Sequence, residues 1–261
     1  MAELTFIGTA TVLLRFGPFT VLTDPNFLHR GQFAYLGKGI VSRRLTEPTP
    51  GIDDLPALDC IVLSHMHGDH WDRVAKRRLN RDTRILTTPK AARALHRQKF
   101  AGAEGLRTWQ TAELEKDGHV LTLTAVPASH ARGSARVLLP PVMGSVLEHR
   151  EPNGALATRL YVTGDTLLID DLRELPRRFP DLDVAVVHLG GTTLPGGLVV
   201  TMDGREGAEL VELLRPRCVV PVHYDDYGVF KSPLSDFLEQ VERRGLARLV
   251  RVVRRGATCA L

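Results

Sequence analysis

The residues best suited to chemistry lie together in one segment, Ser64-His65-Met66-His67-Gly68-Asp69-His70-Trp71. It places three imidazoles and one carboxylate within six residues, in the spacing His-x-His-x-Asp-His. Neutral imidazole and carboxylate are the ligands that suit zinc and similar divalent cations. A cation would also supply the partner that crowded polar groups need. We therefore predict that this segment binds metal.

Two ordinary roles compete with metal binding. Asp69 could cap the helix that is predicted to begin near Trp71, and any one of the histidines could be an exposed loop residue. Each alternative accounts for a single side chain, whereas a metal site accounts for all four. We favour the metal site as a hypothesis that the structural context must confirm.

The elements around this segment would hold it on a loop. The apolar run Cys60-Ile61-Val62-Leu63 is short and β-branched in its middle, which is typical of a buried strand. A helix is predicted from the end of the segment to about Leu79. The histidines would thus follow a buried strand and precede a helix.

The metal segment resembles the signature of the metallo-β-lactamase superfamily. The runs Ile7-Gly-Thr-Ala-Thr-Val-Leu-Leu-Arg15 and Leu22-Thr-Asp-Pro25 resemble the opening of the branch that holds ascorbate-6-phosphate lactonase and N-acyl-phosphatidylethanolamine phospholipase D. The resemblance implies an α/β fold, a four-layer αβ/βα sandwich with one or two metals at the edge between its sheets. The diiron flavoprotein branch usually has glutamate where this chain has His67, so His67 favours the hydrolase branches.

The resemblance also implies a set of seven metal ligands. One cation would be held by His65, His67 and His130, the other by Asp69, His70 and His223, and Asp165 would bridge the two. Asp24 would support the ligand loop from behind, as outer partners of metal ligands do. Asp165 could instead cap the helix that follows it, and a lone histidine at a strand end, such as His130, is usually an ordinary residue.

The activity implied by the resemblance is metal-dependent hydrolysis. Two divalent cations, zinc by default with manganese or iron left open, would activate a hydroxide. Asp69 and Asp165 would be the catalytic carboxylates. The substrate would be small, with an ester, lactone or phosphodiester bond. Arg132, Tyr224 and Lys231 are candidate substrate-binding residues, and with them the substrate could be anionic. Ordinary solvent exposure is the alternative for Arg132 and for the nearby Arg136.

Other functions on the same fold stay open. A metal-dependent nuclease would need an added arm or domain, for which this chain has no room. A non-catalytic binding module would be expected to have lost some of the metal ligands, whereas this chain keeps the full set. A single-iron sulfur dioxygenase would bind iron alone. Thr9 also departs from the branch, which commonly has histidine there, so the role of that histidine does not transfer.

Composition places the chain among globular proteins. It has 261 residues, 43% hydrophobic and 25% charged, with 34 basic and 30 acidic residues and a net charge of +4. No repeat or low-complexity linker divides it, so we predict one domain over residues 1–261. Basic pairs such as Arg77-Arg78 and Arg243-Arg244 are scattered and aromatic content is 6%, so we predict a small-molecule substrate and no nucleic-acid partner. A homo-oligomer is left open.

The compartment is predicted from cysteines and hydropathy. Three cysteines cannot form a paired framework, and Cys60 and Cys218 lie in apolar runs, so we expect reduced core residues. No leader and no membrane-spanning stretch is evident. We therefore expect a cytoplasmic protein.

The remaining elements are predicted from periodicity and turn residues. Three antiparallel strands are expected before Asp24, then a long substrate-covering loop from Asn26 to Pro56. His188 is expected to be a core or rim histidine. The other predicted strands are 84–88, 105–108, 112–115, 119–126, 142–147, 159–163, 184–189, 218–222 and 249–253, and the other helices are 89–99, 170–179, 205–214 and 233–244.

Overall fold

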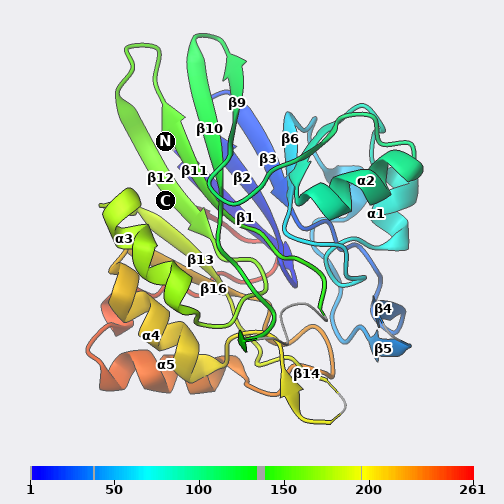
Figure 1. Ribbon diagram of the computed structural model, residues 1–261, viewed down its shortest axis with the longest axis vertical. Helices are drawn as coiled ribbons and strands as arrows, with labels where there is room; N and C mark the ends of the chain where they lie inside the picture. The colour runs from blue at the N-terminus through cyan, green and yellow to red at the C-terminus, as the bar shows by residue number, and fades with distance from the viewer. Residues whose placement is uncertain (1, 38, 134–138, 195) are drawn as a thin grey trace.

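The computed structural model describes residues 2–37, 39–133, 139–194 and 196–261. Two mixed β-sheets pack face to face at its centre, and helices cover the outer face of each sheet (Figure 1). The predicted four-layer αβ/βα sandwich is confirmed. Of the segments described, none forms a helix long and apolar enough to cross a membrane.

The larger sheet has seven strands in the order β17-β1-β2-β3-β6-β7-β8. The first three strands form antiparallel hairpins, as predicted, and β6, β7 and β8 then run parallel to β3. Their bounds are β1 (Ala2–Gly8), β2 (Thr11–Phe16), β3 (Phe19–Thr23), β6 (Cys60–Leu63), β7 (Arg84–Thr87), β8 (Ala103–Gly105) and β17 (Thr258–Ala260). Helices α1 (Arg73–Arg78) and α2 (Pro89–Arg97) are the crossovers between the parallel strands.

The second sheet has six strands in the order β16-β13-β12-β11-β10-β9. Strands β12, β13 and β16 are parallel to one another, and the rest are antiparallel. Their bounds are β9 (Thr111–Lys116), β10 (His119–Val126), β11 (Gly144–Arg150), β12 (Leu156–Val162), β13 (Val184–His188) and β16 (Cys218–Val222). The outer face is covered by 3₁₀ helix η3 (Asp170–Glu174), α3 (Leu175–Arg178), α4 (Gly204–Leu214) and α5 (Leu234–Arg243).

Alternating side chains build the core between the sheets. Leu4 and Leu14 from the seven-stranded sheet share one buried cluster with Leu123 and Leu160 from the six-stranded sheet. The opposite faces of the strands pack on the helices, where Ala75 and Leu95 lie against Ile61 and Ile85. Each sheet is therefore buried on both faces, which explains why its parallel strands are continuous apolar runs.

Three predicted elements were wrong in part. The long loop Asn26–Pro56 contains a hairpin of β4 (Phe33–Gly37) and β5 (Ile40–Arg43), and a short 3₁₀ helix η1 (Ile52–Asp54). The strand predicted at 249–253 is absent, since the described chain there forms 3₁₀ helix η4 (Ala247–Leu249) and one isolated bridge at Val250. The strand predicted at 105–108 lies earlier in the chain, as β8 (Ala103–Gly105). A second small hairpin pairs β14 (Thr193–Leu194) with β15 (Leu198–Val199).

Candidate metal centre

The two parallel regions bring their carboxyl ends to one edge of the sandwich. Strand β6 ends at Leu63, with only Ser64 before His65, and β3, its parallel neighbour, ends directly before Asp24. In the other sheet, Asp165 follows β12 and His223 follows β16. Because parallel strands present their carboxyl ends on the same side, residues far apart in the sequence meet there.

The first cluster consists of His65, His67 and His130. The Nε2 atom of His65 lies 2.9 Å from the Nδ1 atom of His67, and the ring centres of both are 4.7 and 5.0 Å from that of His130. Two nitrogens bound at about 2.0–2.1 Å to one tetrahedral zinc lie roughly 3.3 Å apart. The spacing of His65 and His67 therefore suits one shared cation.

The second cluster consists of Asp69, His70, Asp165 and His223, all buried. Asp165 Oδ2 lies 3.1 Å from His70 Nε2, and Asp165 Oδ1 lies 3.6 Å from His223 Nε2. Asp69 Oδ2 lies 3.5 Å from His223 Nε2. Both oxygens of Asp165 thus face candidate ligands of the second cation, and its role as a bridge to the first cation stays a prediction.

Hydrogen bonds fix which ring nitrogen is available to a cation. The Nδ1 atoms of His130 and His223 lie 3.0 and 3.1 Å from the carbonyl oxygens of Val200 and Leu189. A carbonyl only accepts, so both Nδ1 atoms carry the proton and both Nε2 atoms carry a lone pair. Outer partners of metal-binding histidines act in this way.

Several atoms at the centre are buried without a hydrogen-bond partner. Among the residues described, these include the Nε2 atoms of His70, His130 and His223 and the Oδ1 atoms of Asp69 and Asp165. Unpaired buried polar atoms are costly, and all five point toward the clusters where a cation would be coordinated. The donor set therefore fits two divalent cations.

Asp24 supports this centre from behind. Its Oδ1 atom accepts hydrogen bonds from the backbone N–H of Ser64 (2.7 Å) and the Ser64 hydroxyl (2.9 Å). Its Oδ2 atom lies 3.3 Å from His70 Nδ1 and 3.7 Å from His188 Nε2. Burial opposes ionisation of Asp24, but His70 and His188 outweigh it and lower the pKa of this carboxyl. Asp24 is thus a buried anion that orients His70.

The electrostatics prepare the ligands for a cation. Burial, together with the neighbouring imidazoles, lowers the pKa of His65 well below its usual value and that of His67 to about 4. Although burial opposes its ionisation, His223 and His70 hold the pKa of Asp165 well below its usual range. The first cluster therefore offers neutral imidazoles, and the second offers an ionised carboxylate.

Three residues of the centre adopt left-handed backbone conformations. The φ angles are 54° at Thr9, 36° at Asp24 and 62° at His223, a region that costs non-glycine residues free energy and is common at functional sites. Thr9 is fully buried, and its carbonyl accepts a hydrogen bond from the His223 N–H (2.8 Å). In this chain Thr9 therefore anchors the backbone of His223.

All seven predicted ligands and Asp24 lie in this centre, and the contacts that the structure shows for the three predicted substrate-binding residues are with other residues. Arg132 bonds to Glu206 (2.5 Å), Lys231 Nζ donates to the Gly228 carbonyl, and Tyr224 packs near Phe6. Their role in substrate binding stays a prediction. Arg136 lies outside the described residues.

The sequence analysis missed the place of His188 in the centre. Its ring is fully buried, as predicted for a core histidine, but it also forms a third cluster with Asp24 and His70. The available signal was its position at the end of β13, between the strands that deliver Asp165 and His223. A cavity of about 480 Å³ borders the centre at His130, lined also by Trp109, Ser129 and Ile169.

Comparisons with known proteins agree with this architecture. A UPF0173 metal-dependent hydrolase of Pyrococcus furiosus is 26% identical over 243 residues, which cover 92% of each chain. N-acyl-phosphatidylethanolamine-hydrolyzing phospholipase D 1 of Caenorhabditis elegans is 28% identical over 239 residues, covering 85% of this chain and 64% of that protein.

Similar solved structures share the fold. An isothiocyanate hydrolase from Delia radicum gut bacteria has a TM-score of 0.83 at 21% identity, with 99% of both chains covered. A possible metal-dependent hydrolase from Veillonella parvula has the same TM-score and identity over the full length of both chains. The family model described as a beta-lactamase superfamily domain matches residues 20–224. The chain therefore belongs to the metallo-β-lactamase superfamily, among its metal-dependent hydrolases.

Proposed function

We propose that the protein hydrolyses an ester, lactone or phosphodiester bond of a small substrate with water activated between two divalent cations, zinc by default. The observation that carries this proposal is the set of buried ligand atoms without hydrogen-bond partners, divided between two adjoining clusters. One cation would be held by His65, His67 and His130, and the other by Asp69, His70 and His223, with Asp165 shared.

The chemistry is divided between the cations and the protein. Two cations bound there would lower the pKa of water toward neutrality and stabilise negative charge on a substrate oxygen. Asp165 Oδ2 and His70 Nε2 lie 3.1 Å apart, a spacing that suits two ligands of one cation. Asp69 directs Oδ2 at His223, while its buried Oδ1 has no described partner. That oxygen is therefore suited to take a proton from water and return it to the leaving group.

The relatives support the reaction class and leave the substrate open. One is named for hydrolysing N-acyl-phosphatidylethanolamine and another is an isothiocyanate hydrolase, so this fold serves different bonds. We propose an anionic substrate because Arg132 and Lys231 follow two of the ligands in the chain. The substrate would enter through the cavity at His130.

The test combines metal analysis with a substrate screen. We expect about two cations per wild-type chain and about one in His67→Ala, and turnover of lactones or phosphodiesters lowered by roughly a hundredfold or more, because each cation supplies several kcal/mol of transition-state stabilisation. His29→Ala is the matched control, since His29 is exposed and pairs with Glu47 outside the centre.

Two results would contradict the proposal. One is equal turnover by wild type and His67→Ala across lactones, phosphodiesters and phosphomonoesters. The other is purified protein that holds iron alone and oxidises a thiol-derived substrate, which would favour the sulfur dioxygenase.

A further inference from the structure

The charges of the chain are distributed unevenly over its surface. Residues 73–107, which form α1, β7, α2 and β8, contain eleven lysines and arginines and two acidic residues, a net charge of +9. The whole chain carries +4, so the remainder is net acidic. Eleven of the 34 basic residues of the chain therefore lie in this stretch, whose helices α1 and α2 cover the seven-stranded sheet (Figure 1).

Helix geometry turns these charges outward. Ala91, Ala92 and Leu95 bury one face of α2, and Lys90, Arg93 and Arg97 follow the opposite face at intervals of three and four residues. We define the basic layer as six exposed residues that form no ion pair with any carboxylate in the described structure. They are Lys76, Arg77, Lys90, Arg93, Arg97 and Lys99.

An apolar surface adjoins the basic layer. In the hairpin β4–β5, alternate residues face solvent, and Phe33, Tyr35 and Val41 are 56–58% exposed. Tyr35 is paired directly with Val41, and Phe33 with Arg43, so these side chains share one face of the hairpin. Large apolar residues grouped on a surface usually mark an interaction site.

The hairpin and the basic layer form one continuous surface. A cavity of about 350 Å³ is lined by Phe33 and Tyr35 from the hairpin and by Arg73 and Lys76 from α1. The Arg73 guanidinium donates to the Phe33 carbonyl (3.0 Å), and the Gly68 N–H donates to the Tyr35 carbonyl (2.9 Å). In Figure 1, the hairpin and both helices lie along the same side of the molecule.

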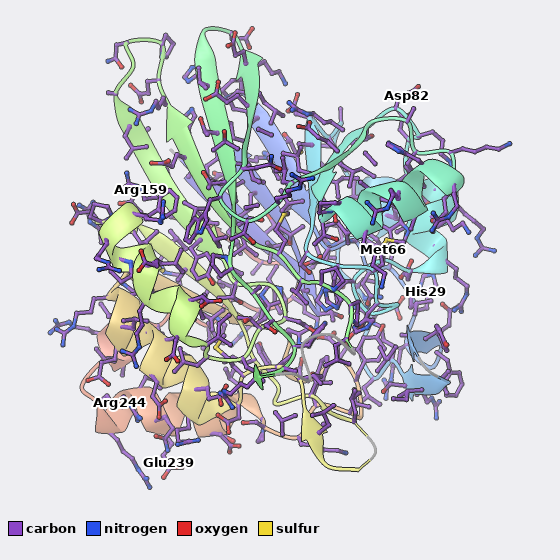
Figure 2. The ribbon with its side chains drawn as sticks, viewed as in Figure 1. His29, Met66, Asp82, Arg159, Glu239 and Arg244 are labelled. Atoms are coloured by element: carbon purple, nitrogen blue, oxygen red, sulfur yellow. The ribbon has the colours of Figure 1, made fainter. Side chains whose placement is uncertain are left out.

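This surface also borders the metal loop, residues 64–71, which carries His65, His67, Asp69 and His70. Met66, which lies between His65 and His67, lines the cavity next to the hairpin and a second groove along α2 that contains Lys90 and Arg97. Figure 2 shows Met66 beside α2. Whatever binds this surface therefore lies next to the metal loop.

We infer that this surface docks the protein on an anionic lipid membrane. Basic side chains attract anionic headgroups, and exposed Phe, Tyr and aliphatic residues enter the headgroup boundary. Single-stranded nucleic acid would be recognised by aromatic stacking, to which Val41 cannot contribute. The inference is independent of the proposed reaction, because it concerns the outer layer and not the ligands.

The first experiment measures sedimentation of the wild-type protein with vesicles. We expect binding to phosphatidylcholine vesicles that contain about 30% phosphatidylglycerol, weakening as salt screens the charges. Vesicles of phosphatidylcholine alone should bind far less protein. Equal binding to both vesicles, or no binding to either, would overturn the inference.

The second experiment tests whether the basic residues on α2 bind the anionic vesicles. In Lys90→Gln/Arg93→Gln/Arg97→Gln, partitioning onto the anionic vesicles should fall by roughly a hundredfold, because each basic residue near the surface contributes about fivefold. Arg215→Gln/Arg248→Gln/Arg254→Gln is the matched control, with the same charge change at exposed positions outside the layer. An equal loss in both variants would overturn the inference.

The third experiment separates membrane from nucleic acid. Phe33→Ser/Tyr35→Ser/Val41→Ser should remove the part of vesicle binding that survives high salt. Its circular dichroism and thermal midpoint should match wild type, because the three side chains are exposed. Tighter binding of a random-sequence oligonucleotide than of vesicles, retained in this variant, would assign the surface to nucleic acid and overturn the inference.

Discussion

His188 lies behind the candidate metal ligands. Its backbone N–H donates to the Thr163 hydroxyl (2.9 Å), its Nδ1 lies 3.1 Å from the same hydroxyl, and its Nε2 faces Asp24. Asp24 in turn faces His70. Three side chains therefore connect the end of β12 to His70, a candidate metal ligand held by the other sheet, and we expect His188 to position it.

Replacing His188 should weaken the cation site at His70. We expect His188→Leu to lower zinc affinity there by roughly tenfold to a hundredfold, since outer partners of metal ligands contribute about that much. His188→Gln keeps a side-chain amide that can donate to Asp24 and should recover much of the loss. Competition with a chromophoric chelator measures both. Equal affinity in wild type and His188→Leu would show that His188 has no such role.

The candidate ligands were predictable, whereas their supports were predictable only in part. The spacing from His65 to His70 is dense enough to indicate a metal, and resemblance supplied His130, Asp165 and His223. His188 has neither signal and stands only at the end of a strand, where a single histidine is usually ordinary. Only the contact between distant strands shows that it faces Asp24.

Asp72 joins helix α1 to the segment that follows Asp24. Its Oδ1 accepts from the backbone N–H groups of Val74 and Ala75 (2.7 and 2.8 Å), which caps the helix. Its Oδ2 accepts from the Leu28 N–H (2.6 Å) and the Asn26 amide (3.2 Å). The cap is therefore Asp72, and Asp69 is left free for the metal centre.

Replacing Asp72 should destabilise both elements together. Asp72→Ala removes a helix cap worth about 1 kcal/mol and leaves buried donors unpaired at about 1–3 kcal/mol each, so we expect a loss of roughly 3 kcal/mol or more. Asp72→Asn keeps one acceptor oxygen and should lose less. Urea unfolding of both variants checks this, and a loss under about 1 kcal/mol in Asp72→Ala would contradict it.

Elements with a strong local pattern were predicted well, and those that depend on distant partners were not. Pro89 at the start of α2 and Asp117-Gly118 between β9 and β10 indicate their elements locally. The hairpin β4–β5 alternates exposed and buried residues, but Gly37 and Gly39 within it and Gly31 just before it made it resemble a loop. The run 249–253 is apolar enough for a strand, yet it meets the edge of β16 only in an isolated bridge between Val250 and Val219.

His149 couples the stability of the sandwich to pH. It lies near the end of β11 far from the metal centre, close to the rings of Phe16 and Phe19 from the other sheet, and its Nε2 is 3.1 Å from His119 Nδ1. Burial, and then His119, lowers the pKa of His149 below its usual 6.5. The unfolded chain therefore binds a proton at this residue more readily than the folded chain does.

The stabilisation from a neutral His149 should fall as the solution becomes acidic. Between about pH 7.5 and pH 5.5 the unfolded state takes up more protons at this residue, so wild-type stability should decline more than that of His149→Gln. The difference between their urea midpoints at the two pH values measures this and cancels the shared pH dependence of the metal centre. Parallel declines would contradict the expectation.

The candidate ligands come from both halves of the sandwich. Four follow β6 in the seven-stranded sheet, and the other three follow strands of the six-stranded sheet. Two cations bound among them would cross-link the halves at that edge, as a disulfide joins two segments. A chain made where divalent metals are scarce would therefore separate more easily along this seam, and proteases would reach it sooner.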